Sequence, residues 1–174
     1  MLLAAGQLNL QPMQSTVSYL GDQATAVGSN PVRRKTDYTC RSIYLPVIRN
    51  DLPEIFEAFD FANPHLSTGA RTGTSVPAQG LFFLNDPMVM DAAAATAGSL
   101  LQQHPAATNQ SLVAAAFHRI TGAEASAEDL LTMQQFLELT ACELTASGTT
   151  DAHSKALALL CHAIFCSSRF QFLD

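Results

Sequence analysis

The segment KALALLCHAIFCSS, residues Lys155–Ser168, decides the fold more than any other stretch of the sequence. Drawn as a helix, it carries apolar residues around nearly its whole circumference. A helix that is apolar on all sides is buried among other elements. Asp151 precedes the segment and is suited to begin a helix. We therefore predict a central helix near the C-terminus, packed among other helices.

The residues before this segment predict further helices, each with its own start or stop signal. The dipeptide Asp86–Pro87 marks the start of a helix that reaches about Gln103. Ser126 and Asp129 resemble a capping box, with Asp in place of Glu or Gln, and open a helix that runs to about Ala146. The remaining helices are a short one over Pro77–Leu84 and an amphipathic one over Gln110–Thr121 that ends at Gly122.

The N-terminal half lacks this periodicity. Residues 7–40 predict a long irregular connection. In RSIYLPV, residues Arg41–Val47, the alternation of Ile43, Leu45 and Val47 on one side predicts a short extended segment, which Pro46 confines to an edge. A two-turn helix is expected over Leu52–Phe59, after Asp51 as its N-cap and with Pro53 at an early position.

The first residues resemble the end of an element more than its beginning. Met1–Ala5 are typical of the last turn of a helix, and Gly6 is suited to end it. We therefore expect a fragment that is truncated at its N-terminus. The predicted fold class is mainly α: an irregular N-terminal half with at most one short strand, followed by a bundle of four to five helices. We predict one C-terminal helical domain over 1–174, made of an irregular arm over 1–50 and a helical core over 51–174.

Composition narrows the class of partner. The 174 residues are 48% hydrophobic and only 14% charged, against roughly 25% charged residues in an average soluble domain. Part of the surface is therefore expected to be covered by upstream sequence. The net charge of -6 argues against nucleic acid as a partner, because such binding depends on Lys and Arg. The sequence shows neither a signal peptide nor a run apolar enough for a membrane span.

The stretch Phe59–Asn85 concentrates polar side chains between apolar borders, and two interpretations stay open. In the first, Asp60 and Arg71 pair and pin an irregular loop, because an unmade buried hydrogen bond costs about 1 to 3 kcal/mol. In the second, Asp60, Arg71, Gln79 and Asn85 bind a sugar-like polyol on which Phe59 or Phe61 stacks. An acid–base role would then fall to Asp60, with Arg71 modulating its charge.

A basic run offers a second candidate binding site. Arg41 and Arg49, with Arg33, Arg34 and Lys35, hold five of the nine cationic residues of an acidic chain. They suit an anionic partner such as a sulfated glycan. The alternative is a solvated loop with salt bridges to nearby acidic residues.

The four cysteines predict neither a disulfide nor a metal site. In an antiparallel helix pair, Cys161 lies some 7 to 8 Å beyond the position opposite Cys142, which exceeds the usual Cα separation in a disulfide, about 4.4 to 6.8 Å. His162 and Cys166 share a helix face, but no second ligand pair has comparable spacing. Neither a catalytic motif nor a self-contained active site is predicted.

Three segments together carry a resemblance to a known family. They are RSIYLPVIRNDLPEIFEAFDFANP, STGARTGTSVPAQGLFFLNDP and the terminal ALALLCHAIFCSSRFQFLD. They resemble the C-terminal domain of unknown function in large exported planctomycete-type proteins, often joined to a cytochrome c domain. The positions that fit the family pattern are Arg41, Ser42, Tyr44, Leu45, Pro46, Phe59, Asp60, Pro64, Arg71, Thr74, Pro77, Gln79, Leu81, Asn85 and Asp174.

The chain also departs from the family pattern. Ala62 stands where Pro is usual, Asn63 where Asp is usual and Gly80 where Ala is usual, while CSSR replaces a frequent N-x-N-E. The resemblance implies an exported multidomain parent, periplasmic or on the cell surface, and it implies no established reaction. Because Thr74 fits the family pattern, the resemblance adds it to the candidate binding residues. The chain has no C-x-x-C-H and so cannot attach a c-type haem, and we expect no cofactor in this segment.

These observations lead to one functional hypothesis and one rival. The first is a non-catalytic structural or interaction module of an exported multidomain protein, with upstream domains as partners. The rival is part of a carbohydrate-processing or carbohydrate-binding site, completed by upstream domains and suited to anionic or neutral polysaccharide utilisation.

Overall fold

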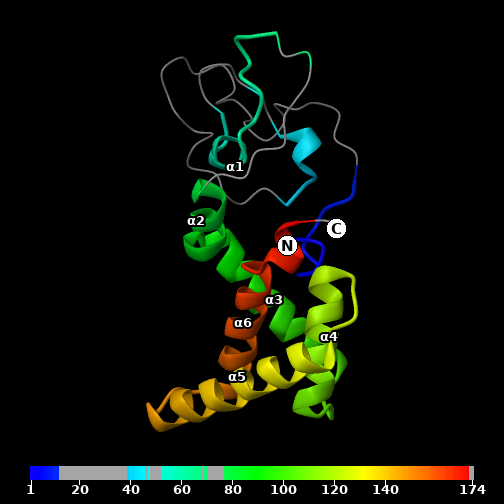
Figure 1. Cartoon of the computed structure of the whole chain (residues 1–174), viewed down its shortest axis with the longest axis vertical. Coiled ribbons are helices and arrows are strands. Elements are labelled where there is room, and N and C mark those ends of the chain that lie inside the picture. Colours follow the sequence, from blue (N-terminus) through cyan, green and yellow to red (C-terminus); the bar gives the residue numbers. More distant parts are fainter. Residues whose placement is uncertain (12–38, 46, 48–51, 68, 70–76, 173–174) are drawn as a thin grey trace. The chain divides into compact units, whose positions relative to one another are not determined.

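The computed structural model describes residues 1–11, 39–45, 47, 52–67, 69 and 77–172. Regular structure in these residues is helical, and the only strand-like pairing among them is a single bridge between Asn9 and Cys40. The prediction of a mainly α fold with an irregular N-terminal half is therefore confirmed (Figure 1). The chain divides into a helical unit, Met1–Gln7 with Phe83–Asp174, and an N-terminal unit, Leu8–Phe82.

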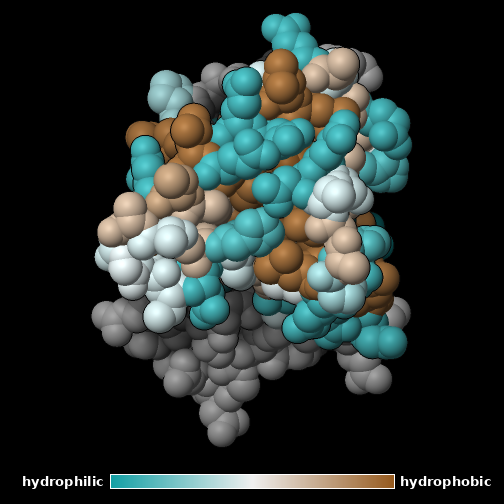
Figure 2. All heavy atoms as spheres, turned by 90° about the horizontal axis from the view of Figure 1, so that it is seen from below, coloured by the Kyte–Doolittle hydropathy of each residue, from teal (hydrophilic) through white to brown (hydrophobic). Residues whose placement is uncertain are grey.

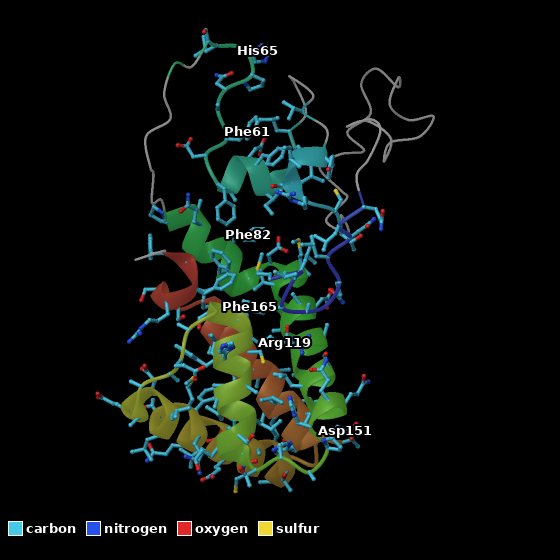
Figure 3. The ribbon with its side chains drawn as sticks, turned by 90° about the vertical axis from the view of Figure 1, so that its right-hand side faces the viewer. Phe61, His65, Phe82, Arg119, Asp151 and Phe165 are labelled. Atoms are coloured by element: carbon cyan, nitrogen blue, oxygen red, sulfur yellow. The ribbon has the colours of Figure 1, made fainter. Side chains whose placement is uncertain are left out.

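The helical unit is built around α6, Ala152–Phe165. This helix packs against α3 (Pro87–Gln103), α4 (Asn109–Thr121), α5 (Ala127–Ala146) and the short α7 (Ser168–Gln171). Its contact with α3 is the most extensive. The ends of α6 are marked by Asp151 and Phe165 in Figure 3. The predicted central helix is confirmed, and α7 was missed because its four residues carry no periodic signal.

The core of the helical unit consists of apolar side chains from all four long helices. Phe165, Leu157 and Leu137 are fully buried, as are Val89 and Val113. Burying a side chain of this size stabilises a fold by about 1.5 to 3 kcal/mol. The core therefore supplies the rigid frame on which the surface features described below are held.

Helix starts and stops follow the local signals in the sequence. The Asp86 side chain accepts a hydrogen bond of 2.8 Å from the backbone N–H of Met88. Ser126 and Asp129 form the full capping box, with the Asp129 N–H donating to Ser126 Oγ at 3.1 Å. Gly122 ends α4 at φ 75°, in the left-handed region that glycine adopts without strain. These boundaries agree with the predictions to within a residue or so.

The N-terminal turn ends as its sequence indicates. The Gly6 N–H donates to Leu3 O at 3.1 Å and the Gln7 N–H to Leu2 O at 2.9 Å, with Gly6 at φ 70°. This pair of bonds and the positive φ define a Schellman motif. The turn is held to α4 by Arg119, labelled in Figure 3, whose Nε donates to Ala4 O at 2.6 Å.

The N-terminal unit corrects one prediction. Instead of an extended segment, Ser42–Tyr44 form a single turn of 3-10 helix, η2, with the Leu45 N–H donating to Ser42 O at 3.1 Å. Ile43 is 70% exposed whereas Leu45 is 5% exposed, so the two side chains do not share a buried face. Alternation over so few residues was too short to prevent a turn, and Leu45 is buried beside Cys40.

The next helix in this unit is also shorter than predicted. Helix α1 spans Glu54–Ala58, because Pro53 has extended backbone angles and serves as the N-cap. Ile55 and Phe56 from α1 pack against the cluster of Cys40 and Leu45. The predicted N-cap Asp51 lies outside the described residues. Helix α2 spans Pro77–Asn85, close to the predicted range.

Candidate functional site

Asp60 is the residue on which the rival acid–base hypothesis depends. Its φ is 50°, one of two positive values among the described residues other than glycine. The Asp60 N–H donates to Glu57 O at 3.2 Å, and the Phe61 N–H donates to Phe56 O at 2.8 Å. These two bonds form a Schellman motif in which Asp60 takes the place usual for glycine. Asp is one of the few other residues that adopt this conformation. The backbone of Asp60 therefore ends helix α1.

The phenylalanines around Asp60 pack on one another. The rings of Phe56 and Phe61 stack with centroids 4.6 Å apart and an interplanar angle of 18°. A hydrophobic contact between these two positions commonly accompanies the Schellman motif. Phe59 meets Phe82 edge to face at 5.5 Å. Figure 3 labels Phe61 and Phe82. Each ring proposed as a sugar platform thus has a protein ring as a neighbour.

The other predicted binding residues are distributed over both units. Arg41 is exposed directly before η2, and Gln79 is half-buried in the first turn of α2. Asn85 is exposed at the end of α2 and belongs to the helical unit. Asp60, Gln79 and Asn85 each interact with other groups of the chain. Arg49, Arg71 and Thr74 lie outside the described residues, so the proposed pairing of Asp60 with Arg71 stays a prediction.

The residues considered as a metal-ligand pair instead bind one backbone carbonyl. His162 Nε2 lies 2.9 Å from Phe83 O, and Cys166 Sγ donates to the same oxygen at 3.3 Å. Since a carbonyl only accepts, the proton of neutral His162 must be on Nε2. Phe83 lies in the last turn of α2, where carbonyl groups lack intrahelical donors. We call this arrangement the Phe83 clamp. The i, i+4 spacing of His162 and Cys166 indicated a shared helix face, and only the structure reveals the acceptor that they share.

Burial suppresses thiol chemistry at Cys161 and Cys166. All four cysteines are free. Burial raises the pKa of the Cys161 thiol to about 12 and also raises the pKa of Cys166. Both side chains are therefore neutral thiols near neutral pH, and neither has the thiolate character of a nucleophile. No group of three or more potential metal ligands occurs within the part of the chain that the structure describes.

An open apolar groove lies on the surface of the helical unit. It has a volume of about 340 Å³ and is formed by α3, α6 and the end of α5. Its polar groups come from Lys155 and from His162, which already donates to Phe83 O. The other lining residues are Met90, Ala93, Leu144, Ala158 and Leu159. Sequence reasoning missed the groove, because it is formed where three helices meet.

Two further histidines, His65 and His153, are exposed and make different contacts. His153 Nε2 lies 3.0 Å from Asn109 Oδ1, which links the start of α6 to the start of α4. His65 is exposed in a loop, and its backbone N–H donates to Asn63 Oδ1 at 2.9 Å. Such contacts are typical of surface structure. No helix in the described ranges combines the length and apolar character needed to cross a membrane.

The chain matches a family of known proteins over most of its length. A family model described as "PSD1: Protein of unknown function (DUF1553)" matches residues 1–137. The matched range includes the N-terminal turn, the polar stretch with Asp60, helices α1 to α4 and most of α5. No curated protein and no solved structure matches the chain.

Proposed function

The chain belongs to the PSD1 family of proteins of unknown function (DUF1553), and on that premise we propose that it is a non-catalytic packing and interaction module of an exported multidomain protein. The single observation that carries this proposal is the apolar groove of the helical unit. Its walls are aliphatic side chains and Met90, with Lys155 as its only charged residue. The free energy falls when a partner removes apolar surface of this kind from water.

The backbone role of Asp60 also supports the module. Its positive φ is accounted for by the end of α1, so no catalytic purpose is needed to explain the conformation. Asp60 is exposed, and its backbone N–H takes part in the hydrogen bonds that end α1. Export, and upstream domains as partners, enter the proposal through the family resemblance.

The rival function is a carbohydrate site completed by upstream domains. The position of Asp60 between Phe59 and Phe61 favours this function. Both phenylalanines are only half-buried. A sugar could pack against the exposed part of these rings while Asp60 accepts hydrogen bonds from its hydroxyl groups. Arg41 is the described cation that would suit a sulfated polysaccharide.

A polysaccharide panel separates these two functions. The chain is incubated with neutral and sulfated polysaccharides, and both binding and release of reducing ends are measured. The module proposal predicts neither binding nor turnover, and no difference between the wild type and Asp60→Asn. Turnover or binding that Asp60→Asn abolishes would overturn the module proposal and favour the carbohydrate site.

A further inference from the structure

We propose that the apolar groove of the helical unit binds the outer face of α5 from a second copy of this chain. The inference rests on the proposed interaction function and specifies its partner. The apolar walls of the groove favour an occupant with apolar side chains, and the positive charge of Lys155 favours carboxylates beside them. Helix α5 carries both features on its exposed side.

The groove is accessible and carries Lys155, one of the three Lys and Arg residues of the helical unit. Met90 and Leu159, which line it, are each 46% exposed. Of the cations of this unit, Arg119 donates to Ala4 O and Gln103 Oε1, and Arg169 lies 3.5 Å from Asp129. Lys155 is exposed at the groove. An acidic partner is therefore favoured at this place on an otherwise acidic surface.

The outer face of α5 is an apolar row flanked by carboxylates. Leu131 and Leu139 are 59% and 67% exposed, and exposed Cys142 extends the row by another turn. Leu139 and Cys142 are three residues apart and Leu131 lies two turns before Leu139, so the three lie on one side of the helix over about 16 Å, with exposed Gln135 between the two leucines. Glu138 and Glu143 are exposed and lie on either side of the row. On the side of the helical unit where α5 lies, hydrophobic residues gather in patches separated by hydrophilic ones (Figure 2).

Geometry requires that the row comes from another molecule. Leu144 of α5 forms part of the groove wall, so α5 cannot also lie in the groove of its own chain. In a second copy, Leu139 would enter between Met90 and Leu159, and Glu138 or Glu143 would approach Lys155. Such contacts bury apolar area on both copies and neutralise the cation in a less hydrated site.

Sedimentation equilibrium of the 174-residue chain over a range of concentrations tests the proposal. We expect the wild type to self-associate and Lys155→Glu to weaken association about tenfold or more, because like charges then face each other. Glu138→Lys with Glu143→Lys should weaken it similarly. An equimolar mixture of Lys155→Glu chains with Glu138→Lys/Glu143→Lys chains should associate again, since the groove of each variant then faces opposite charges on α5 of the other variant.

Controls separate the proposed interface from general charge effects and from unfolding. Glu124→Lys changes an exposed carboxylate outside the row and should leave association unchanged. Circular dichroism should show the same helix content in every variant. A wild-type chain that stays monomeric, or association that Lys155→Glu leaves unchanged, overturns the second copy as the occupant. That result leaves the module proposal standing, whereas turnover of a polysaccharide would overturn the module itself.

Discussion

The Phe83 clamp makes a quantitative prediction about stability. Phe83 O accepts from His162 Nε2 and from Cys166 Sγ, and Phe83 is 6% exposed. Removing one donor by His162→Ala or Cys166→Ala leaves the other in place, so each single change should cost about 1 kcal/mol of unfolding free energy. Removing both withdraws both of these donors from the carbonyl of a buried residue, where unmade hydrogen bonds cost about 1 to 3 kcal/mol.

The double variant should therefore lose more stability than the sum of the single variants. Urea unfolding followed by circular dichroism measures each free energy, and the cycle should show a coupling of at least about 0.5 kcal/mol. Cys166→Ser keeps a donor and should stay close to wild type. His153→Ala, on the same helix but at an exposed contact with Asn109, should change stability by less than about 0.5 kcal/mol. Additive losses in the cycle would refute the shared acceptor.

Three further outcomes follow from the core and the titrating groups. Phe165→Ala removes a fully buried ring between helices and should cost about 3 to 5 kcal/mol in the same urea assay; a loss below 1 kcal/mol would show that α6 is not central. Burial raises the pKa of Cys161 from 9.0 to about 12, so on a rise in pH the thiol loses its proton first in the unfolded chain. The free energy of unfolding should therefore fall between pH 9 and 12 by up to about 1.4 kcal/mol per pH unit. Cys161→Ala should reduce this slope, and an unchanged slope in that variant would contradict the burial of the thiol. The hydrogen bond from Ser126 lowers the pKa of Asp129, so the ionised carboxylate should stabilise the fold above pH 3.8 and lose this effect on acidification. Asp129→Asn should therefore lower the melting temperature at pH 7 and leave it unchanged near pH 2. Equal losses at both pH values would show that the charge of Asp129 does not stabilise the fold.

Local signals in the sequence were sufficient for the helical unit. Asp86, Ser126 and Gly122 act through hydrogen bonds or backbone angles within their own turn, so their effect can be read without knowledge of the fold. The segment Lys155–Ser168 is apolar on nearly all sides as a helix, so its burial could also be predicted without knowledge of its neighbours. Element types and boundaries were therefore predictable.

Contacts between distant segments were beyond such reasoning. His162 and Phe83 are 79 residues apart, and only their packing reveals why a histidine and a cysteine share a helix face. The positive φ of Asp60 was equally hidden, because glycine is the residue expected at that position of a helix end; its role as a ligand-binding residue stays a prediction. The 3-10 turn at Ser42–Tyr44 stands where an extended segment was predicted, because an alternation of only three apolar residues is too short to decide between the two, and Leu45 is buried while Ile43 is exposed.

Thermal unfolding of Asp60 variants tests the central claim most directly, namely that this residue serves the backbone of a non-catalytic module. We expect the free energy of unfolding to follow how well each residue tolerates a positive φ. Asp60→Asn and Asp60→Gly should stay within about 1 kcal/mol of the wild type. Asp60→Val should lose about 1 to 2 kcal/mol more, because a β-branched residue is strained in this conformation. Equal stability of the Asn and Val variants would contradict the claim.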